Sequence, residues 1–225
     1  MGRSGSKDLF NEIKFESPSH VMAWVNAFPG PAAPPTHHTK SLLVNCTAIV
    51  TTADVDRIRS FTNVTRLEVR VTECPLNKPG LDAFHNLSPV IESFRVRFCS
   101  GVPLSKLFAL VYSFPSLSDL AIVGGEIDKD GEVFLPSTSP VFTFTGTLLL
   151  SCDLKYVMGQ LLRLPDRSLD FREIVLEIDS HREKDAVQHA MRLMERCSNT
   201  LECIDIDFSS NRESRPFGSC VGSSG

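Results

Sequence analysis

The sequence has few of the features that assign a chain to a functional class directly. None of its apolar runs approaches the length of about 18 residues that a membrane span needs. The opening stretch MGRSGSKDLFNEIKFES lacks the apolar core of a signal peptide. Neither sign of charge dominates, because 23 basic residues stand against 27 acidic ones, a net charge of -4. We therefore expect a cytoplasmic or nuclear protein, with neither nucleic acid nor a membrane among its partners.

Catalytic and metal-binding motifs are also missing from the sequence. It contains no GxSxG, no HExxH and no glycine-rich phosphate loop. Its seven cysteines include no pair with CxxC spacing, which favours reduced cysteines over disulfides or a metal site. The sequence therefore predicts a protein that is not an enzyme, with no catalytic residue, no cofactor and no metal.

What the sequence does contain is a repeat of short apolar runs. The runs are KSLLVNC, VTRLEVRV, IESFRVRF, LSDLAIVG, TGTLLLSC, FREIVLEI and LECIDIDF. The first inward apolar residues of these runs are Leu42, Leu67, Phe94, Leu120, Leu148, Ile174 and Ile204. Their average separation of about 27 residues falls within the period of leucine-rich repeats.

Within each run an apolar residue recurs at every second position, which indicates a strand with one buried face. The residues expected to be buried include Leu67, Val69 and Val71 in the second run, and Ile204, Ile206 and Phe208 in the last. The strands are expected near residues 41–45, 65–71, 92–98, 118–123, 146–151, 172–178 and 202–208.

Helical patterns separate several of these strands. The segments TTADVDRIRSF, PLSKLFALVYSF, DLKYVMGQLLRL and REKDAVQHAMRLMERC carry apolar residues at helical spacing. Asp153 is expected to cap the third of these helices. The residues of the fourth expected to face inward are Ala186, Val187, Ala190, Leu193, Met194 and Cys197.

A strand and a helix repeated at a fixed period require parallel strands joined by crossover helices. The expected fold is α/β, an irregular leucine-rich-repeat-like solenoid with parallel strands on the concave face and helices on the convex face. The repeat domain of about seven units is expected to span residues 8–208, between a disordered N-terminus (1–7) and a flexible C-terminal tail (209–225).

The strand residues that alternate with the buried ones are expected to line the concave face. The candidate partner-binding residues are Arg66, Glu68, Arg70, Arg95, Arg97, Ala121, Val123, Leu149, Glu177, Asp205 and Asp207, and Ser151 and Val175 share their face. The face would change from basic, through apolar, to acidic, which suits a protein partner with complementary ends. The alternative is a solvated face whose arginines and carboxylates pair across strands.

Several longer stretches resemble a divergent group of fungal F-box/leucine-rich-repeat-like proteins over about residues 8–208. The stretches are WVNAFPGPAAPPTHHTKSLLVNC, TTADVDRIRSFTNVTRLEV, SFRVRFCSGVPLSKLFALVYSFPSLSDLAIVG, FTGTLLL, GQLLRLPDRSLDFREIVLEI and ERCSNTLECIDI.

The resemblance implies that the repeats form the substrate-recognition region of a ubiquitin-ligase component. In that family an F-box binds the adaptor of the ligase, but no F-box-like opening is visible here. We therefore expect a protein substrate on the concave face, and a ligase adaptor as partner only if an F-box exists outside this chain. The alternative is a truncated or orphan structural fragment with no binding role of its own.

Overall fold

The computed structural model describes residues 10–29, 34–72, 80–85, 87–99, 101–128, 143–165, 168–179 and 185–209. The N-terminal segment expected to be disordered, 1–7, lies outside the described residues. So does the expected tail, apart from Ser209, which ends the last strand of the structure.

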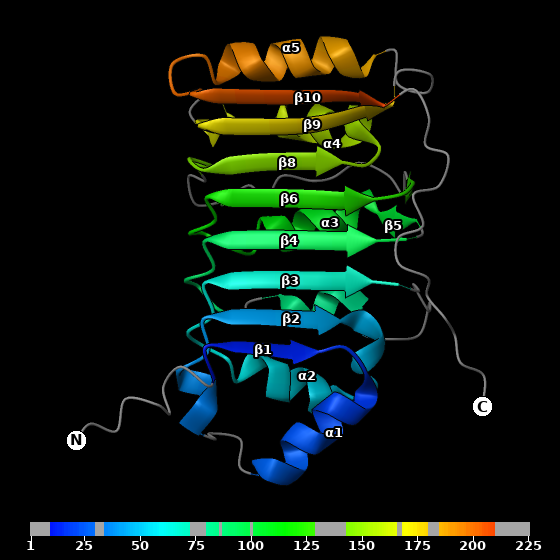
Figure 1. Cartoon of the computed structure of the whole chain (residues 1–225), viewed down its shortest axis with the longest axis vertical. Coiled ribbons are helices and arrows are strands. Elements are labelled where there is room, and N and C mark those ends of the chain that lie inside the picture. The colour runs from blue at the N-terminus through cyan, green and yellow to red at the C-terminus, as the bar shows by residue number, and fades with distance from the viewer. Residues whose placement is uncertain are drawn as a thin grey trace.

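The centre of the fold is a sheet of eight parallel strands, in the order β1-β2-β3-β4-β6-β8-β9-β10 (Figure 1). The strands are β1 (Glu12–Phe15), β2 (Ser41–Asn45), β3 (Arg66–Val71), β4 (Ser93–Phe98), β6 (Asp119–Gly124), β8 (Thr147–Ser151), β9 (Glu173–Asp179) and β10 (Cys203–Ser209). The order along the sheet follows the order along the chain, so each strand is added beside the one before it. This arrangement confirms the expected α/β class with parallel strands.

Seven of the eight strands lie on the seven expected segments, with bounds that differ by one residue at most. The sequence interpretation missed β1, which lies before the first recognised repeat. β1 is only four residues long, too short for its alternation to stand out, yet Ile13 and Phe15 are buried in the same way as the apolar residues of the longer strands.

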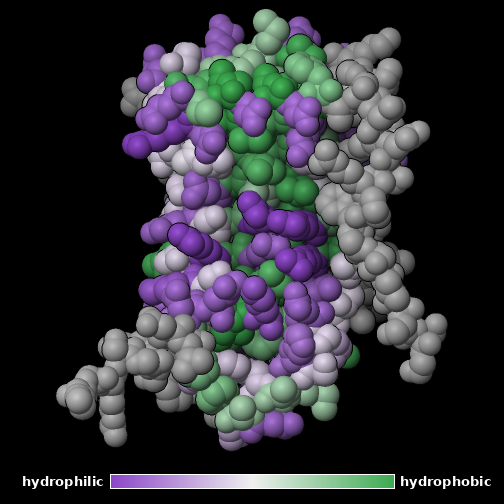
Figure 2. All heavy atoms as spheres, in the orientation of Figure 1, coloured by the Kyte–Doolittle hydropathy of each residue, from purple (hydrophilic) through white to green (hydrophobic). Residues whose placement is uncertain are grey.

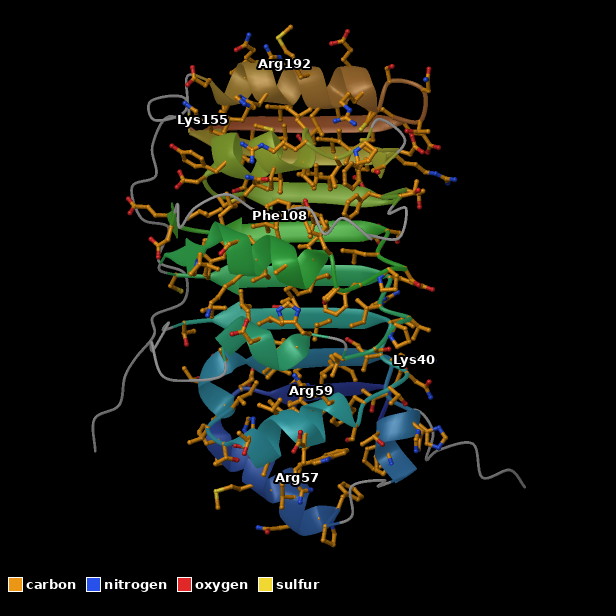
Figure 3. All side chains as sticks on the ribbon, turned by 180° about the vertical axis from the view of Figure 1, so that it is seen from behind. Lys40, Arg57, Arg59, Phe108, Lys155 and Arg192 are labelled. Atoms are coloured by element: carbon orange, nitrogen blue, oxygen red, sulfur yellow. The ribbon has the colours of Figure 1, made fainter. Side chains whose placement is uncertain are left out.

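Helices cover one face of the sheet. They are α1 (Pro18–Ala27), α2 (Thr52–Arg59), α3 (Leu104–Val111), α4 (Leu154–Leu161) and α5 (Ala186–Arg196). In Figure 1, α2, α3 and α4 lie behind the strands, and in Figure 3, seen from behind, they lie in front. α1 lies near the β1 end of the stack and α5 lies beside β10. None of the helices in the described residues has the length and apolar character needed to cross a membrane.

Shorter elements complete the connections. The 3-10 turns are η2 (Pro34–His37), η3 (Cys46–Ala48) and η4 (Gly80–Phe84). A small two-stranded sheet pairs β5 (Val102–Pro103) with β7 (Ile127–Asp128) in parallel.

A single hydrophobic core fills the space between the sheet and the helices. The inward residues of neighbouring strands stand in register, as in the row that joins Val69, Val96 and Ile122, and all three are fully buried. Each such side chain contributes about 1.5–3 kcal/mol to folding. Stacking of one unit on the next is therefore the main source of stability in this fold.

Local signals explain where the helices begin. α2 starts at a capping box, in which Asp54 N–H donates to Thr51 Oγ1 at 3.2 Å and Thr51 N–H donates to Asp54 Oδ2 at 2.8 Å. Asp153 stands at the N-cap position of α4, as expected, but its carboxylate does not cap the helix. It instead accepts a hydrogen bond from the backbone N–H of Ile127 at 3.1 Å, which ties α4 to β7.

Two expectations of burial near the C-terminal end are wrong. Ile204 and Phe208 of β10 are 48% and 56% exposed, and Val187 of α5 is 42% exposed. The reason is positional, because β10 is the last strand of the sheet and no described helix follows it. Their side chains have the pattern of core residues, but within the described chain no further unit packs against them.

Candidate functional site

The predicted site residues share one face of the sheet, opposite α2, α3 and α4, which we call the open face. They alternate along each strand with the buried residues, and the parallel register aligns them in rows across the sheet. One row contains Glu68, Arg95, Ala121, Leu149, Val175 and Asp205. The next contains Arg70, Arg97, Val123 and Ser151, and continues at the same strand positions with Glu177 and Asp207. Arg66 lies at the start of β3, two residues before Glu68.

The basic part of the open face is centred on Glu68. Its Oε1 lies 3.0 Å from Arg70 Nε on the same strand and 3.3 Å from Arg97 Nε on the neighbouring strand. Arg70 Nη1 also lies 3.5 Å from Oε1 of Glu16, which follows β1. The cross-strand pairing offered as an alternative to partner binding therefore exists between Arg97 and Glu68, while Arg70 pairs with Glu68 on its own strand and with Glu16.

Arg66 and Arg95 differ from their neighbours. Neither makes an ion pair with any of the residues that the structure describes. Arg66 is exposed and Arg95 is half-buried, opposite Glu68 and Ala121 in the register. Two positive charges on β3 and β4 thus have no carboxylate partner among the described residues.

The middle of the open face is apolar. Ala121 and Val123 on β6, Leu149 on β8 and Val175 on β9 are all partly exposed. Figure 2 shows the same division, with hydrophilic residues gathered over β3 and β4 and a hydrophobic band farther along the stack. A partner that covers this band removes apolar surface from water, which is the main favourable term in protein association.

The acidic part of the open face lies on β9 and β10, two strands that contain no Lys or Arg. Glu177, Asp205 and Asp207 are exposed. Ser151, expected to line the face as an accessible residue, is instead only 5% exposed, and its hydroxyl donates to Glu177 Oε2 at 2.5 Å.

One row of open-face residues was predicted only in part, because Arg66 alone of its members was named as a site residue. It lies at the strand starts, where Asp119 Oδ1 accepts a hydrogen bond from Thr147 N–H at 2.7 Å and Thr147 Oγ1 donates to Glu173 Oε2 at 2.9 Å. The alternation could have indicated Thr147 and Glu173, since each stands two residues before a predicted site residue. The position of Asp119 depends on Gly146, where a Cβ atom would come within 1.9 Å of Asp119 Oδ1.

The ionisable groups with displaced pKa values lie on the helices. Burial raises the pKa of Tyr112 at the end of α3 and of Cys197 at the end of α5. At the surface, the hydrogen bond between Lys155 and Asp185 lowers the pKa of the Asp185 carboxyl and raises the pKa of the Lys155 amine. None of the described His, Cys, Asp and Glu residues forms a group of three that could hold a metal ion. What the described open face offers is charge and apolar area, which are features of a binding surface.

Comparison with known proteins adds no relative. The chain matches no protein-family model, no curated protein and no solved structure. The function is therefore inferred from the chain's own residues.

Proposed function

We propose that this chain is a non-enzymatic protein-interaction module whose open face binds a protein substrate. In this proposal the repeats form an irregular leucine-rich-repeat-like solenoid, with the strands on its concave face and the helices on its convex face. The module would be the substrate-recognition region of an F-box-like ubiquitin-ligase component, acting in the cytoplasm or nucleus. The resemblance of the repeat segments to that family supports the second part of the proposal.

The single observation that carries the binding proposal is the change of character along the open face. Arg66 and Arg95 provide unpaired positive charge among the described residues, the side chains of β6 and β8 provide apolar area, and Asp205 and Asp207 provide negative charge. Charges at the two ends fix the register of a partner, while the apolar centre supplies affinity. The partner predicted by this order has an acidic segment at one end and a basic segment at the other.

The charge contribution is best tested at Arg66 and Arg95. A substitution of Arg97 would also break the ion pair with Glu68. The loss of the Arg97 charge could then not be separated from the change in Glu68. Charge reversal is unsuitable too, because a carboxylate at position 95 would stand directly opposite Glu68 in the register. The R66Q/R95Q variant removes both charges and keeps much of each side chain.

The experiment uses the immobilised full chain to capture proteins from a fungal cell extract, followed by identification of the captured proteins. The unsubstituted chain is compared with R66Q/R95Q and with K40Q/R172Q. The control removes the same charge from two exposed residues that stand just before β2 and β9. Substrates of the open face should be captured about fivefold to tenfold less by R66Q/R95Q, and equally by the control and the unsubstituted chain.

Two outcomes would contradict the proposal. Equal capture by all three chains would show that the open face does not select partners. The second is capture of the ligase adaptor alone, to the same extent with and without Arg66 and Arg95. It would mean that the chain contacts the ligase rather than a substrate, although no F-box is visible in the sequence.

A further inference from the structure

The two edges of the sheet differ in how they are covered. At the first edge, Ile13 and Phe15 of β1 are 8% and 3% exposed, and Phe15 lies edge-to-face with Trp24 of α1 at a ring-centroid distance of 6.0 Å. At the last edge, Ile204 and Phe208 of β10 are 48% and 56% exposed. A helix thus covers the apolar residues at the first edge, whereas Ile204 and Phe208 at the last edge stay exposed.

β10 pairs with β9 along its whole length, from Cys203 to Ser209. No strand among the described residues pairs with its other side. A strand edge of this kind presents backbone N–H and C=O groups that can pair with an added strand. The addition of an extended segment to such an edge is a recurring mode of peptide recognition.

The side chains of β10 specify what that segment should look like. The apolar residues Ile204, Ile206 and Phe208 stand on the helix side, and Asp205 and Asp207 stand on the open face. Both aspartates are exposed, and β9 and β10 contain no basic residue to offset them. Because side chains alternate between the faces of a sheet, an added strand would place every second residue beside the aspartates and the others beside the apolar row.

α5 extends the apolar row. It lies beside β10 at the end of the stack (Figure 1). Its buried stripe, which includes Ala190 and Leu193, is followed one position later by a second stripe of Val187, Met191 and Met194. Val187 and Met191 are 42% and 62% exposed, and Met194 is partly buried against the core. Four of the seven large exposed hydrophobic residues of the described chain thus gather at this one end.

A second copy of the chain does not suit this edge. Antiparallel pairing of two β10 strands about Ile206 sets Asp205 of each copy opposite Asp207 of the other. A shift of the register to either side sets Asp205 opposite Asp205 or Asp207 opposite Asp207. Like charges directly opposite one another destabilise a strand pair, so the aspartates oppose self-association.

The first strand of another copy does not suit the edge either. If β1 were added in parallel with Lys14 opposite Asp205, Glu16 would stand opposite Asp207. If Lys14 stood opposite Asp207, Glu12 would stand opposite Asp205. Each favourable contact is accompanied by a repulsive one, so neither edge of this chain complements β10.

We propose that the free edge of β10 binds an extended segment of another protein by strand addition, and that in this segment Lys or Arg alternates with apolar residues. The basic residues pair with Asp205 and Asp207 on the open face. The apolar residues cover Ile204, Ile206 and Phe208 and the exposed stripe of α5. This edge site is separate from Arg66 and Arg95, but it shares Asp205 and Asp207 with the acidic end of the open face.

The test measures the Kd of the full chain for a short labelled peptide in which lysine and valine alternate. A second peptide has the same composition but groups its lysines and valines in two blocks, which keeps the charge and removes the alternation. The variant D205N/D207N removes the edge charges without changing side-chain size. The matched control D56N/E92Q removes two charges from exposed positions on α2 and before β4.

The proposal expects the alternating peptide to bind more tightly than the block peptide. D205N/D207N should weaken its binding about tenfold, whereas D56N/E92Q and R66Q/R95Q should leave it unchanged. Hydrogen exchange should show that the peptide protects the backbone amides of β10.

Three results would overturn the proposal. Equal binding of the two peptides would indicate nonspecific charge attraction, and absence of binding would show that the edge is not such a site. If sedimentation showed that the free chain is a dimer, and a charged residue in place of Phe208 dissociated it, the edge would be occupied by a second copy of the chain. Amides of β10 that are as protected in the free chain as those of β9 would mean that another part of this chain already covers the edge.

Discussion

Arg97 Nε lies 3.3 Å from Glu68 Oε1, and this contact joins β3 to β4 across the open face. The same oxygen lies 3.0 Å from Arg70 Nε. One carboxylate therefore serves two of the four arginines on these strands. Among the described residues Arg66 and Arg95 make no ion pair, and in the proposed function they are the charges that interact with an acidic partner segment.

Glu68→Gln is expected to strengthen binding while changing stability little. The substitution removes the carboxylate that holds Arg70 and Arg97, so the positive potential of the basic part of the open face increases and association with an acidic segment becomes faster. Partly exposed ion pairs contribute about 1 kcal/mol or less to stability. Urea unfolding and association rates at low and high salt would measure both effects.

Glu92→Gln is the matched control for Glu68→Gln, since Glu92 is exposed and lies just before β4. It should change neither the unfolding midpoint nor the association rate by a comparable amount. A loss of binding in Glu68→Gln would show that Glu68 itself contacts the partner, which is contrary to the role assigned here.

Gly146→Ala is expected to destabilise the fold. A Cβ atom at this position would lie 1.9 Å from Asp119 Oδ1, the oxygen that accepts a hydrogen bond from Thr147 N–H at 2.7 Å. Asp119 must move, and losing its bond at the start of β8 should lower the free energy of unfolding by about 1–3 kcal/mol. The urea midpoint at an unchanged m-value measures this loss.

A second glycine provides a control of opposite sign. Gly159 lies inside α4, where an added Cβ would have His189 Nε2 at 3.9 Å as its nearest neighbour, an ordinary contact distance. Gly159→Ala should therefore raise the free energy of unfolding by up to about 1 kcal/mol, because alanine favours the helix. If both substitutions destabilised the chain equally, the specific role of Asp119 would be wrong.

Tyr112 predicts a loss of stability at alkaline pH. Burial raises its pKa, an effect that outweighs the lowering by Arg163, so the folded state keeps the phenol protonated. Its contribution is fully present below the ordinary tyrosine pKa of about 10, and it is lost as pH rises further because the unfolded chain then releases the proton.

The free energy of unfolding of the unsubstituted chain should therefore fall more steeply above pH 10 than that of Tyr112→Phe, by up to about 1.4 kcal/mol per pH unit. Urea midpoints at several pH values from neutral to strongly alkaline measure the two slopes. The contributions of the other titrating groups are common to both chains, so they drop out of the difference between the slopes. Parallel slopes would contradict the assignment.

Much of the sheet could be predicted because its signal is local. Alternating apolar residues such as Leu67, Val69 and Val71 are 3% exposed or less, and the constant spacing of such runs implies neighbouring parallel strands. The same parity assigned the candidate site residues to a single face. Periodicity alone determines both features, so neither needs knowledge of contacts between distant residues.

The rest depends on what packs against each residue. Ile204 and Phe208 have the pattern of buried residues, yet they are exposed because no described unit packs beyond β10. Asp153 has the position of a helix cap, but its carboxylate instead accepts a hydrogen bond from the nearby N–H of Ile127. Which arginines pair with Glu68 is likewise decided by side-chain reach in three dimensions.

The most direct test of the central claim is site-specific photocrosslinking in cell extract. A photoreactive residue replaces Val123, in the apolar middle of the open face, or Asp56, on the surface of α2. We expect discrete crosslinked proteins from position 123 whose yield falls about fivefold to tenfold in the R66Q/R95Q background, and none from position 56. Crosslinks from position 56 alone, or crosslinks from position 123 whose yield is unchanged in R66Q/R95Q, would contradict the claim that the open face binds partners through Arg66 and Arg95.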